Sequence, residues 1–221
     1  MTATPPLPLS AIEARVLGCL VEKQATTPEV YPLTLNATVS ACNQKSNRDP
    51  IMDLDERAVQ QIVEALMRKH LVMEKSGFGS RVSKYQHRFC NTGFGSPSFT
   101  PQETAILCEL LVRGPQTPGE LKPRAGRMSE LTDVGEVELA LMNLATREDG
   151  PFVAQLPREA GRRDSRHAHL FSGDVEVSEV VAAPAAEPRP KPQTERIERL
   201  EELVSELRRE LNELKEKLGD A

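Results

Sequence analysis

Histidines are the residues of this sequence with the widest chemical range, because imidazole binds metals and exchanges protons near neutral pH. His70, His87, His167 and His169 lie in or beside segments that we expect to form strands. On a strand, His167 and His169 would share one face and could act as two metal ligands. The spacing indicates no third ligand, so a pair of surface histidines is the more ordinary interpretation.

Other patterns that would indicate catalysis are missing from the sequence. It contains no phosphate-cradling glycine loop, no nucleophile elbow and no zinc-peptidase helix motif. The four cysteines are widely spaced, form no C-x-x-C pair and are typical of buried reduced thiols: Cys19, Cys42, Cys90 and Cys108. We therefore expect no enzymatic activity, no cofactor and no bound metal.

The 221 residues carry a net charge of -5, which is unevenly distributed. Lys plus Arg against Asp plus Glu number 11 against 9 in residues 1–95, 9 against 11 in residues 96–173 and 8 against 13 in residues 174–221. Any nucleic-acid contact would then depend on local basic patches. The longest apolar run, residues 106–112, is broken by Glu109 and is too short to span a bilayer, and residues 1–8 lack a signal pattern. We expect a cytoplasmic protein that does not enter a membrane.

An internal repeat organises the elements that would position these residues. Ser10 with Glu13 and Thr100 with Glu103 both read as helix-capping boxes, 90 positions apart. Apolar residues follow each box at helical spacing, and further helices are expected over residues 35–42 and 120–125, then 59–67 and 137–145. The period then becomes alternating over residues 71–75 and 81–89, and again over 152–156 and 167–171, which predicts a β-hairpin in each copy.

Three helices and a hairpin predict a winged helix-turn-helix domain, with a generic three-helix domain as the alternative. We therefore expect a mainly α protein with small β-hairpins, of the α+β class, containing two tandem winged helix-turn-helix domains. Residues 8–92 would form the first domain, 97–173 the second, 174–194 a Pro-rich flexible linker and 195–219 a coiled-coil helix.

The last segment has the strictest periodicity in the chain. Its apolar residues occupy the a and d positions of three heptads: Ile197, Leu200, Val204, Leu207, Leu211, Leu214 and Leu218. β-Branched residues at a and leucine at d favour a two-stranded coiled coil, so we expect a homodimer. The alternative is a single amphipathic helix that docks on the domains of its own chain.

Several stretches resemble the YceH-type family of uncharacterised bacterial proteins. They are residues 17–24, 41–50, 76–79, 147–153 and 169–173, and the segment from Cys42 to Pro50 is the most specific. The resemblance implies a tandem winged-helix fold, and it implies no activity.

Double-stranded DNA is the first partner that we predict, because each third helix would enter a major groove and each hairpin would contact the backbone. Alternation places Lys84, Gln86 and Arg88 on the solvent face of their strand. The candidate DNA contacts in the first domain are Lys45, Arg48, Gln60, Gln61, Lys84 and Arg88, and those in the second hairpin are Arg162, Arg163 and Arg166. The alternative for the polar residues 43–48 is a capped helix end and a solvated loop.

The charge of the third helices argues against groove insertion. Three carboxylates accompany Gln60 and Gln61 in the first, and in the second Asp133, Glu136 and Glu138 have few cationic neighbours. The alternative hypothesis is therefore a protein-interaction scaffold without DNA binding, like accessory proteins of chromosome condensation.

Overall fold

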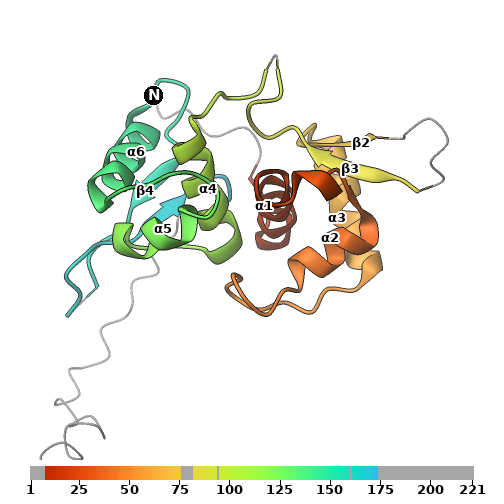
Figure 1. Cartoon of the computed structure of the whole chain (residues 1–221), viewed down its shortest axis with the longest axis horizontal. Helices are drawn as coiled ribbons and strands as arrows, with labels where there is room; N and C mark the ends of the chain where they lie inside the picture. The colour runs from red at the N-terminus through yellow and green to blue at the C-terminus, as the bar shows by residue number, and fades with distance from the viewer. Residues whose placement is uncertain (1–7, 76–81, 94, 160, 174–221) are drawn as a thin grey trace, which may run out of the picture. The chain divides into compact units, whose positions relative to one another are not determined.

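The computed structural model describes residues 8–75, 82–93, 95–159 and 161–173, and within these ranges the fold is mixed α/β, with six α-helices and two small antiparallel sheets (Figure 1). Contacts group residues 1–177 into one unit and residues 178–221 into a second, and the second lies wholly outside the described residues. We call residues 8–92 the first repeat and residues 97–173 the second repeat.

The first repeat contains, in order, α1 (Ala11–Thr26), a short 3₁₀ helix (Pro28–Val30), β1 (Leu33–Thr34), α2 (Leu35–Cys42), α3 (Glu56–Arg68), β2 (Val72–Lys75) and β3 (Lys84–His87). The second contains α4 (Pro101–Arg113), α5 (Pro118–Ala125), α6 (Val134–Thr146), β4 (Val153–Gln155) and β5 (His167–His169). The expected helices and hairpin strands are thus confirmed, with strands shorter than the alternating segments.

Both helix-capping boxes are present. The Ser10 hydroxyl accepts from the Glu13 amide, and the Glu13 carboxylate accepts from the Ser10 amide at 2.8 Å. Thr100 and Glu103 repeat this arrangement at the start of α4. Because these pairs satisfy amide groups that the helix leaves free, they fix where α1 and α4 begin.

The sheet of the first repeat has the order β1–β3–β2, with Leu33 opposite Tyr85 and Lys75 opposite Lys84. β1 was not predicted, because two residues carry no periodic signal. The second repeat has only β4 paired with β5, but an isolated bridge between Gln116 and His167 lies just before α5, as β1 lies just before α2.

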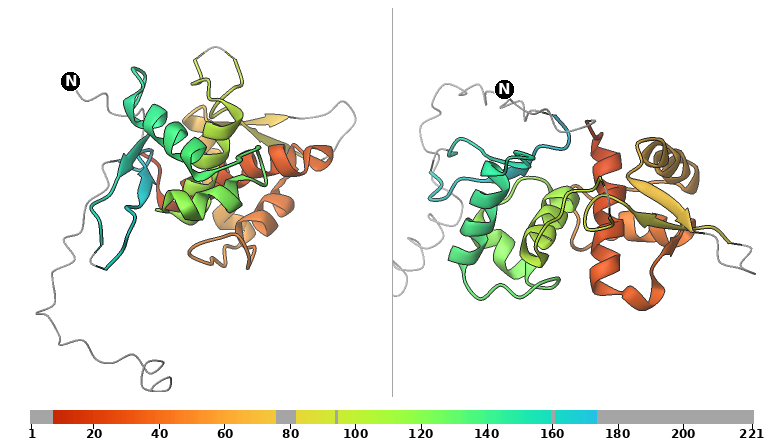
Figure 2. Two further views of the ribbon diagram at one scale, coloured as in Figure 1. Left: turned by 60° about the vertical axis from the view of Figure 1, so that its left-hand side comes forward. Right: turned by 90° about the horizontal axis from the view of Figure 1, so that it is seen from above.

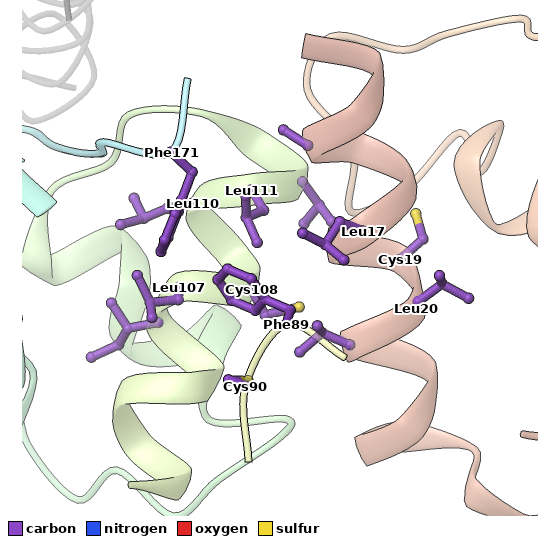
Figure 3. Packing of buried hydrophobic residues seen from close by; sticks show 14 of the residues in the cluster. Leu17, Cys19, Leu20, Phe89, Cys90, Leu107, Cys108, Leu110, Leu111 and Phe171 are labelled. Carbon is purple, nitrogen blue, oxygen red and sulfur yellow. The ribbon is translucent and has the colours of Figure 1, made fainter. Parts of the chain in front are cut away.

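The two repeats pack through α1 and α4, which lie side by side with α2 and α3 on one side and α5 and α6 on the other (Figure 2). Residues 13–22 of α1 are all buried, so this helix has no solvent face over that stretch. The Cys108 thiol donates to the Gly18 carbonyl at 3.3 Å, and these two residues are 90 positions apart, the offset of the repeat. Leu17 and Leu111 lie between the two helices near this contact, whereas Leu20 and Leu107 point away from it on opposite sides (Figure 3).

The repeat extends to individual side-chain contacts. The Lys69 ammonium lies 2.8 Å from Glu13 and donates to the Pro8 carbonyl at 3.0 Å. Arg147, 78 positions later, lies 3.7 Å from Glu103 and donates to the Ser98 carbonyl at 2.9 Å. Each third helix is thereby connected to the start of the first helix of its own repeat.

An aromatic cluster joins the bases of the two hairpins. Phe89 contacts Phe171 edge-on at a centroid distance of 4.8 Å, and Phe99 contacts Phe152 at 4.9 Å. Edge-to-face pairs at these distances are favourable beyond the area that they bury. Phe89 and Phe171 occupy equivalent places at the end of the last strand of their repeats.

Candidate nucleic-acid interface

The outer face of α3 is the first part of the candidate interface. Asp55 begins the helix by accepting from the Ala58 amide at 2.6 Å, and Val59, Val63 and Leu66 are its buried residues. The opposite face is exposed and lies over a shallow hollow lined by Glu56, Arg57, Gln60, Gln61 and Glu64.

Gln60 and Gln61 are both exposed, as a role in base recognition requires. The Gln60 amide donates to the Glu64 carboxylate at 3.2 Å, which leaves Gln61 as the freer of the two amides. Arg57 forms no ion pair within the described residues.

The hairpin β2–β3 forms the second part. Arg88 is exposed while His87 and Phe89 are buried, which confirms the predicted facing of that end of the strand; Lys84 and Gln86 are half-buried. Lys75 and Lys84 stand directly opposite each other at the turn end of the hairpin, where β2 ends and β3 begins. Like charges in such a cross-strand pair repel, and neither ammonium forms an ion pair with another described residue.

Arg48 lies inside the fold, away from any surface that DNA could reach. Its side chain is 0% exposed and contacts the Glu22 carboxylate at 2.5 Å, and its Nε donates to the Ala41 carbonyl at 2.9 Å. The structure therefore gives this predicted phosphate contact a structural role instead. Lys45, three residues earlier, is exposed and stays in the candidate interface.

The segment from Cys42 to Pro50 mainly joins the two repeats. Its Asp49 amide donates to the Val112 carbonyl at 3.2 Å, and its Asn47 side chain accepts from Arg113 of α4. Asn43 is held by two hydrogen bonds to the Leu54 backbone. The alternative of a capped helix end and a solvated loop thus fits only in part, because hydrogen bonds hold Asn43, Asn47 and Arg48 to the fold.

A buried ionic network completes the junction. Arg127 bridges Glu22 at 3.3 Å and Glu109 at 2.7 Å, and Arg113 lies 3.0 Å from Glu109. Burial opposes ionisation of Glu22, but its hydrogen bond with Arg48 and the surrounding positive charge outweigh burial and lower the pKa of Glu22. The sequence did not identify these glutamates as buried, because the helical pattern of α1 and α4 predicts one solvent-exposed face on each helix.

Only one of the three predicted arginines in the second hairpin is free of an ion pair among the described residues. Arg162 and Arg166 lie 3.4 and 3.7 Å from Glu159, whereas Arg163 is exposed and unpaired. Arg163 lines a hollow of about 660 Å³ that also contains Glu138 and Asp164. The electrostatic attraction of this hairpin for phosphate is therefore weak.

The outer face of α6 differs in kind from that of α3. Val134, Leu139 and Met142 are 38%, 55% and 56% exposed. The residues that pack inward are Val137, Ala140, Leu141 and Leu144, as the helical pattern predicts. Val134, Leu139 and Met142 lie outside this inward-facing pattern. Their presence in the sequence indicates that the outer face of α6 carries apolar side chains as well as acidic ones.

The histidine pair lies on one face of β5, as expected. Burial lowers the pKa of His169 to about 4 and also lowers that of His167, so both rings are neutral at pH 7. The described part of the chain contains no group of three or more His, Cys, Asp or Glu placed to hold a metal ion. All four cysteines are buried and free, as predicted.

The predicted dimerisation residues from Ile197 to Leu218, the Pro-rich linker and the coiled-coil helix lie outside the described residues. Among those that are described, no helix is long and apolar enough to cross a membrane.

Fold and surface together define a class: a mixed α/β protein built from a duplicated unit of three helices and a hairpin. The family model described as protein of unknown function, DUF480, matches residues 9–162. A UPF0502 protein of Enterobacter sp. (strain 638) is 53% identical over 96% of this chain and 98% of its own length. UPF0502 proteins of Aeromonas hydrophila and Vibrio parahaemolyticus are 51% and 55% identical, over 96% and 94% of this chain and 97% and 94% of theirs. The chain belongs to this bacterial family, DUF480 or UPF0502, which confirms the resemblance found in the sequence.

Proposed function

We propose that the chain is a tandem winged-helix protein that binds double-stranded DNA through its first repeat. The element order α1, β1, α2, α3, β2, β3 and the sheet order β1–β3–β2 support the winged-helix assignment. In such a domain the third helix enters the major groove, and the hairpin contacts the neighbouring backbone.

The observation that carries the proposal is the Lys75–Lys84 pair at the turn end of the hairpin. Two ammonium groups face each other across the ladder without a described acidic partner. A phosphate placed beside them would relieve their repulsion and release counterions from the DNA.

Each residue of the interface then has a distinct role. Lys45, Lys75 and Lys84 neutralise phosphates, and Gln60 and Gln61 hydrogen bond to adenine edges. In the second repeat Arg163 is the one arginine of the predicted set that is free to add a backbone contact.

The test is fluorescence anisotropy of the full chain with mixed-sequence duplex DNA over a salt series. Each phosphate contact adds about -0.9 to the slope of log affinity against log salt, so a Lys75→Gln/Lys84→Gln variant should have a slope shallower by about 2. Lys122→Gln, on α5, removes a lysine that forms no ion pair with another described residue and should leave the slope nearly unchanged. Absence of binding at low salt, or equal slopes for the double variant and wild type, would exclude this interface.

Protein binding is the second candidate function, and the outer face of α6 favours it. Leu139 and Met142, three positions apart, are neighbours on the exposed face of α6, and Val134 is also exposed, whereas α3 exposes polar residues at its outer positions. Exposed apolar patches of this kind mark contact surfaces between proteins. In such a scaffold the outer faces of the two repeats have different partners. The outer face of α6 binds another protein, and a second copy of the chain is one such partner.

Sedimentation of the full chain separates the two ways of self-association. Met142→Lys should abolish it when α6 forms the contact, whereas deletion of residues 190–221 should weaken it when the heptad segment does. A full-length protein that is monomeric at high concentration would contradict the homodimer.

A further inference from the structure

A cavity of about 340 Å³ lies where the two repeats meet, at the base of the first hairpin. Its apolar lining comes from both repeats: Leu9, Leu71, Phe89, Phe152 and Phe171. The three phenyl groups belong to the aromatic cluster and are held by their mutual contacts. A rigid aromatic floor at a junction between two structural units is a common setting for a small-molecule site.

The rim of this cavity is basic although the chain as a whole is acidic. Lys69, His70 and Arg88 line it, and none of its lining residues is Asp or Glu. Lys69 is engaged with Glu13 and the Pro8 carbonyl. Arg88 is exposed and forms no ion pair within the described residues, so its guanidinium is available to an anion.

His70 occupies a backbone position that ordinarily favours glycine. Its φ is 59°, and the Leu71 amide donates to the Leu66 carbonyl at 2.9 Å, which closes a Schellman-type end of α3 around His70. Glycine adopts this conformation without steric cost. The chain instead keeps an imidazole there, at the rim of the cavity and beside Arg88.

We infer that this cavity binds a small organic anion with an apolar body, of the class of aromatic or medium-chain aliphatic carboxylates. The apolar part packs on Phe89, Phe152 and Phe171, and the carboxylate accepts hydrogen bonds from Arg88 and His70. Arg88 thereby belongs to a ligand site and not to the DNA interface: it follows Lys84 by four residues, roughly 13 Å along the strand.

The test uses 8-anilinonaphthalene-1-sulfonate, an aromatic anion whose fluorescence rises in apolar sites, with the full-length protein. We expect saturable binding to one site and displacement by decanoate. Arg88→Gln removes a charged hydrogen-bond donor and should weaken binding about tenfold. Arg57→Gln, which removes the same charge on the outer face of α3, is the matched control and should bind as wild type does.

Two further variants separate a specific site from general apolar adsorption. Thr92→Trp places an indole at the lining and should block the probe; because the chain has no tryptophan, its emission also reports directly on a ligand. N-phenyl-1-naphthylamine, an uncharged analogue, should not respond to Arg88→Gln. Urea unfolding of each variant verifies that it is folded.

Three outcomes would overturn the inference: no saturable binding to wild type, unchanged affinity in Arg88→Gln, or unchanged affinity in folded Thr92→Trp. None of these outcomes depends on whether the chain binds DNA, because the probe experiments contain none.

Discussion

Gly18→Ala is the substitution that tests the junction of the repeats most directly. A Cβ atom at Gly18 would lie 2.7 Å from Val112 Cγ1 and 2.9 Å from the Cβ of Leu111. Ordinary van der Waals contact begins at 3.4 Å, so Val112 Cγ1 would have to move by about 0.7 Å and the Leu111 Cβ, which is fixed to the α4 backbone, by about 0.5 Å. The contact lies between the buried middle of α1 and the buried last turn of α4, where the packing has little room to adjust.

Two opposing effects set the expected magnitude. Overpacking a core costs about 1–3 kcal/mol, and this contact belongs near the upper limit because the Leu111 Cβ cannot move without its backbone. Alanine regains about 1 kcal/mol of helix propensity over glycine. We therefore expect Gly18→Ala to lower the free energy of unfolding by about 2 kcal/mol.

Urea unfolding of the full chain, followed by far-UV circular dichroism, measures this change. With a slope of about 2 kcal/mol per molar urea, the midpoint should fall by about 1 M. Gly119→Ala is the matched control, because its Cβ would meet no atom within 4 Å in α5, and it should be stabilising by about 0.5 kcal/mol. A Gly18→Ala protein as stable as wild type would refute the tight contact between α1 and α4.

Three further predictions concern stability. Arg48→Ala should lower the free energy of unfolding, measured in urea, by about 3 kcal/mol, because Arg127 and Lys23, both partly exposed, would be the described ion-pair partners left to Glu22. Lys45→Ala, in the same loop, is the control and should change the free energy of unfolding by less than about 0.5 kcal/mol. His70→Gly should raise stability by about 1 kcal/mol while weakening binding of the anionic probe, and a loss of stability would contradict the strain assigned to its left-handed backbone. Burial holds the pKa of His87 at about 4, below the 6.5 of the unfolded chain, so its contribution to stability is complete above pH 6.5 and is lost as the pH falls toward 4. Unfolding midpoints measured between these pH values should fall less for His87→Gln than for wild type.

The sequence predicted the parts of the fold that follow from local rules. The capping boxes at Ser10 and Thr100 and the apolar spacing of α3 and α6 depend on residues three to four positions apart, so a single chain displays them directly. The alternation around His87 similarly identified which side of β3 faces the core.

Contacts between distant segments could not be predicted in this way. Arg48 reads as a solvent-exposed cation until the fold brings Glu22 against it, 26 positions away. The burial of α1 on all sides depends on α4, which the helical pattern of residues 11–26 does not reveal. The cavity beside Arg88 depends likewise on phenyl groups contributed by the other repeat.

The contact between Gly18 and Cys108 also shows how two repeats in one chain differ from the two copies of a symmetric dimer. In a symmetric homodimer, a residue that meets its own equivalent must meet an identical copy, so a glycine could face only a glycine. Here equivalent positions of the two repeats carry different residues, and the thiol of one donates to the backbone carbonyl of the other. Because one chain carries both repeats, the two positions need not be identical, and α3 and α6 can likewise have different outer faces.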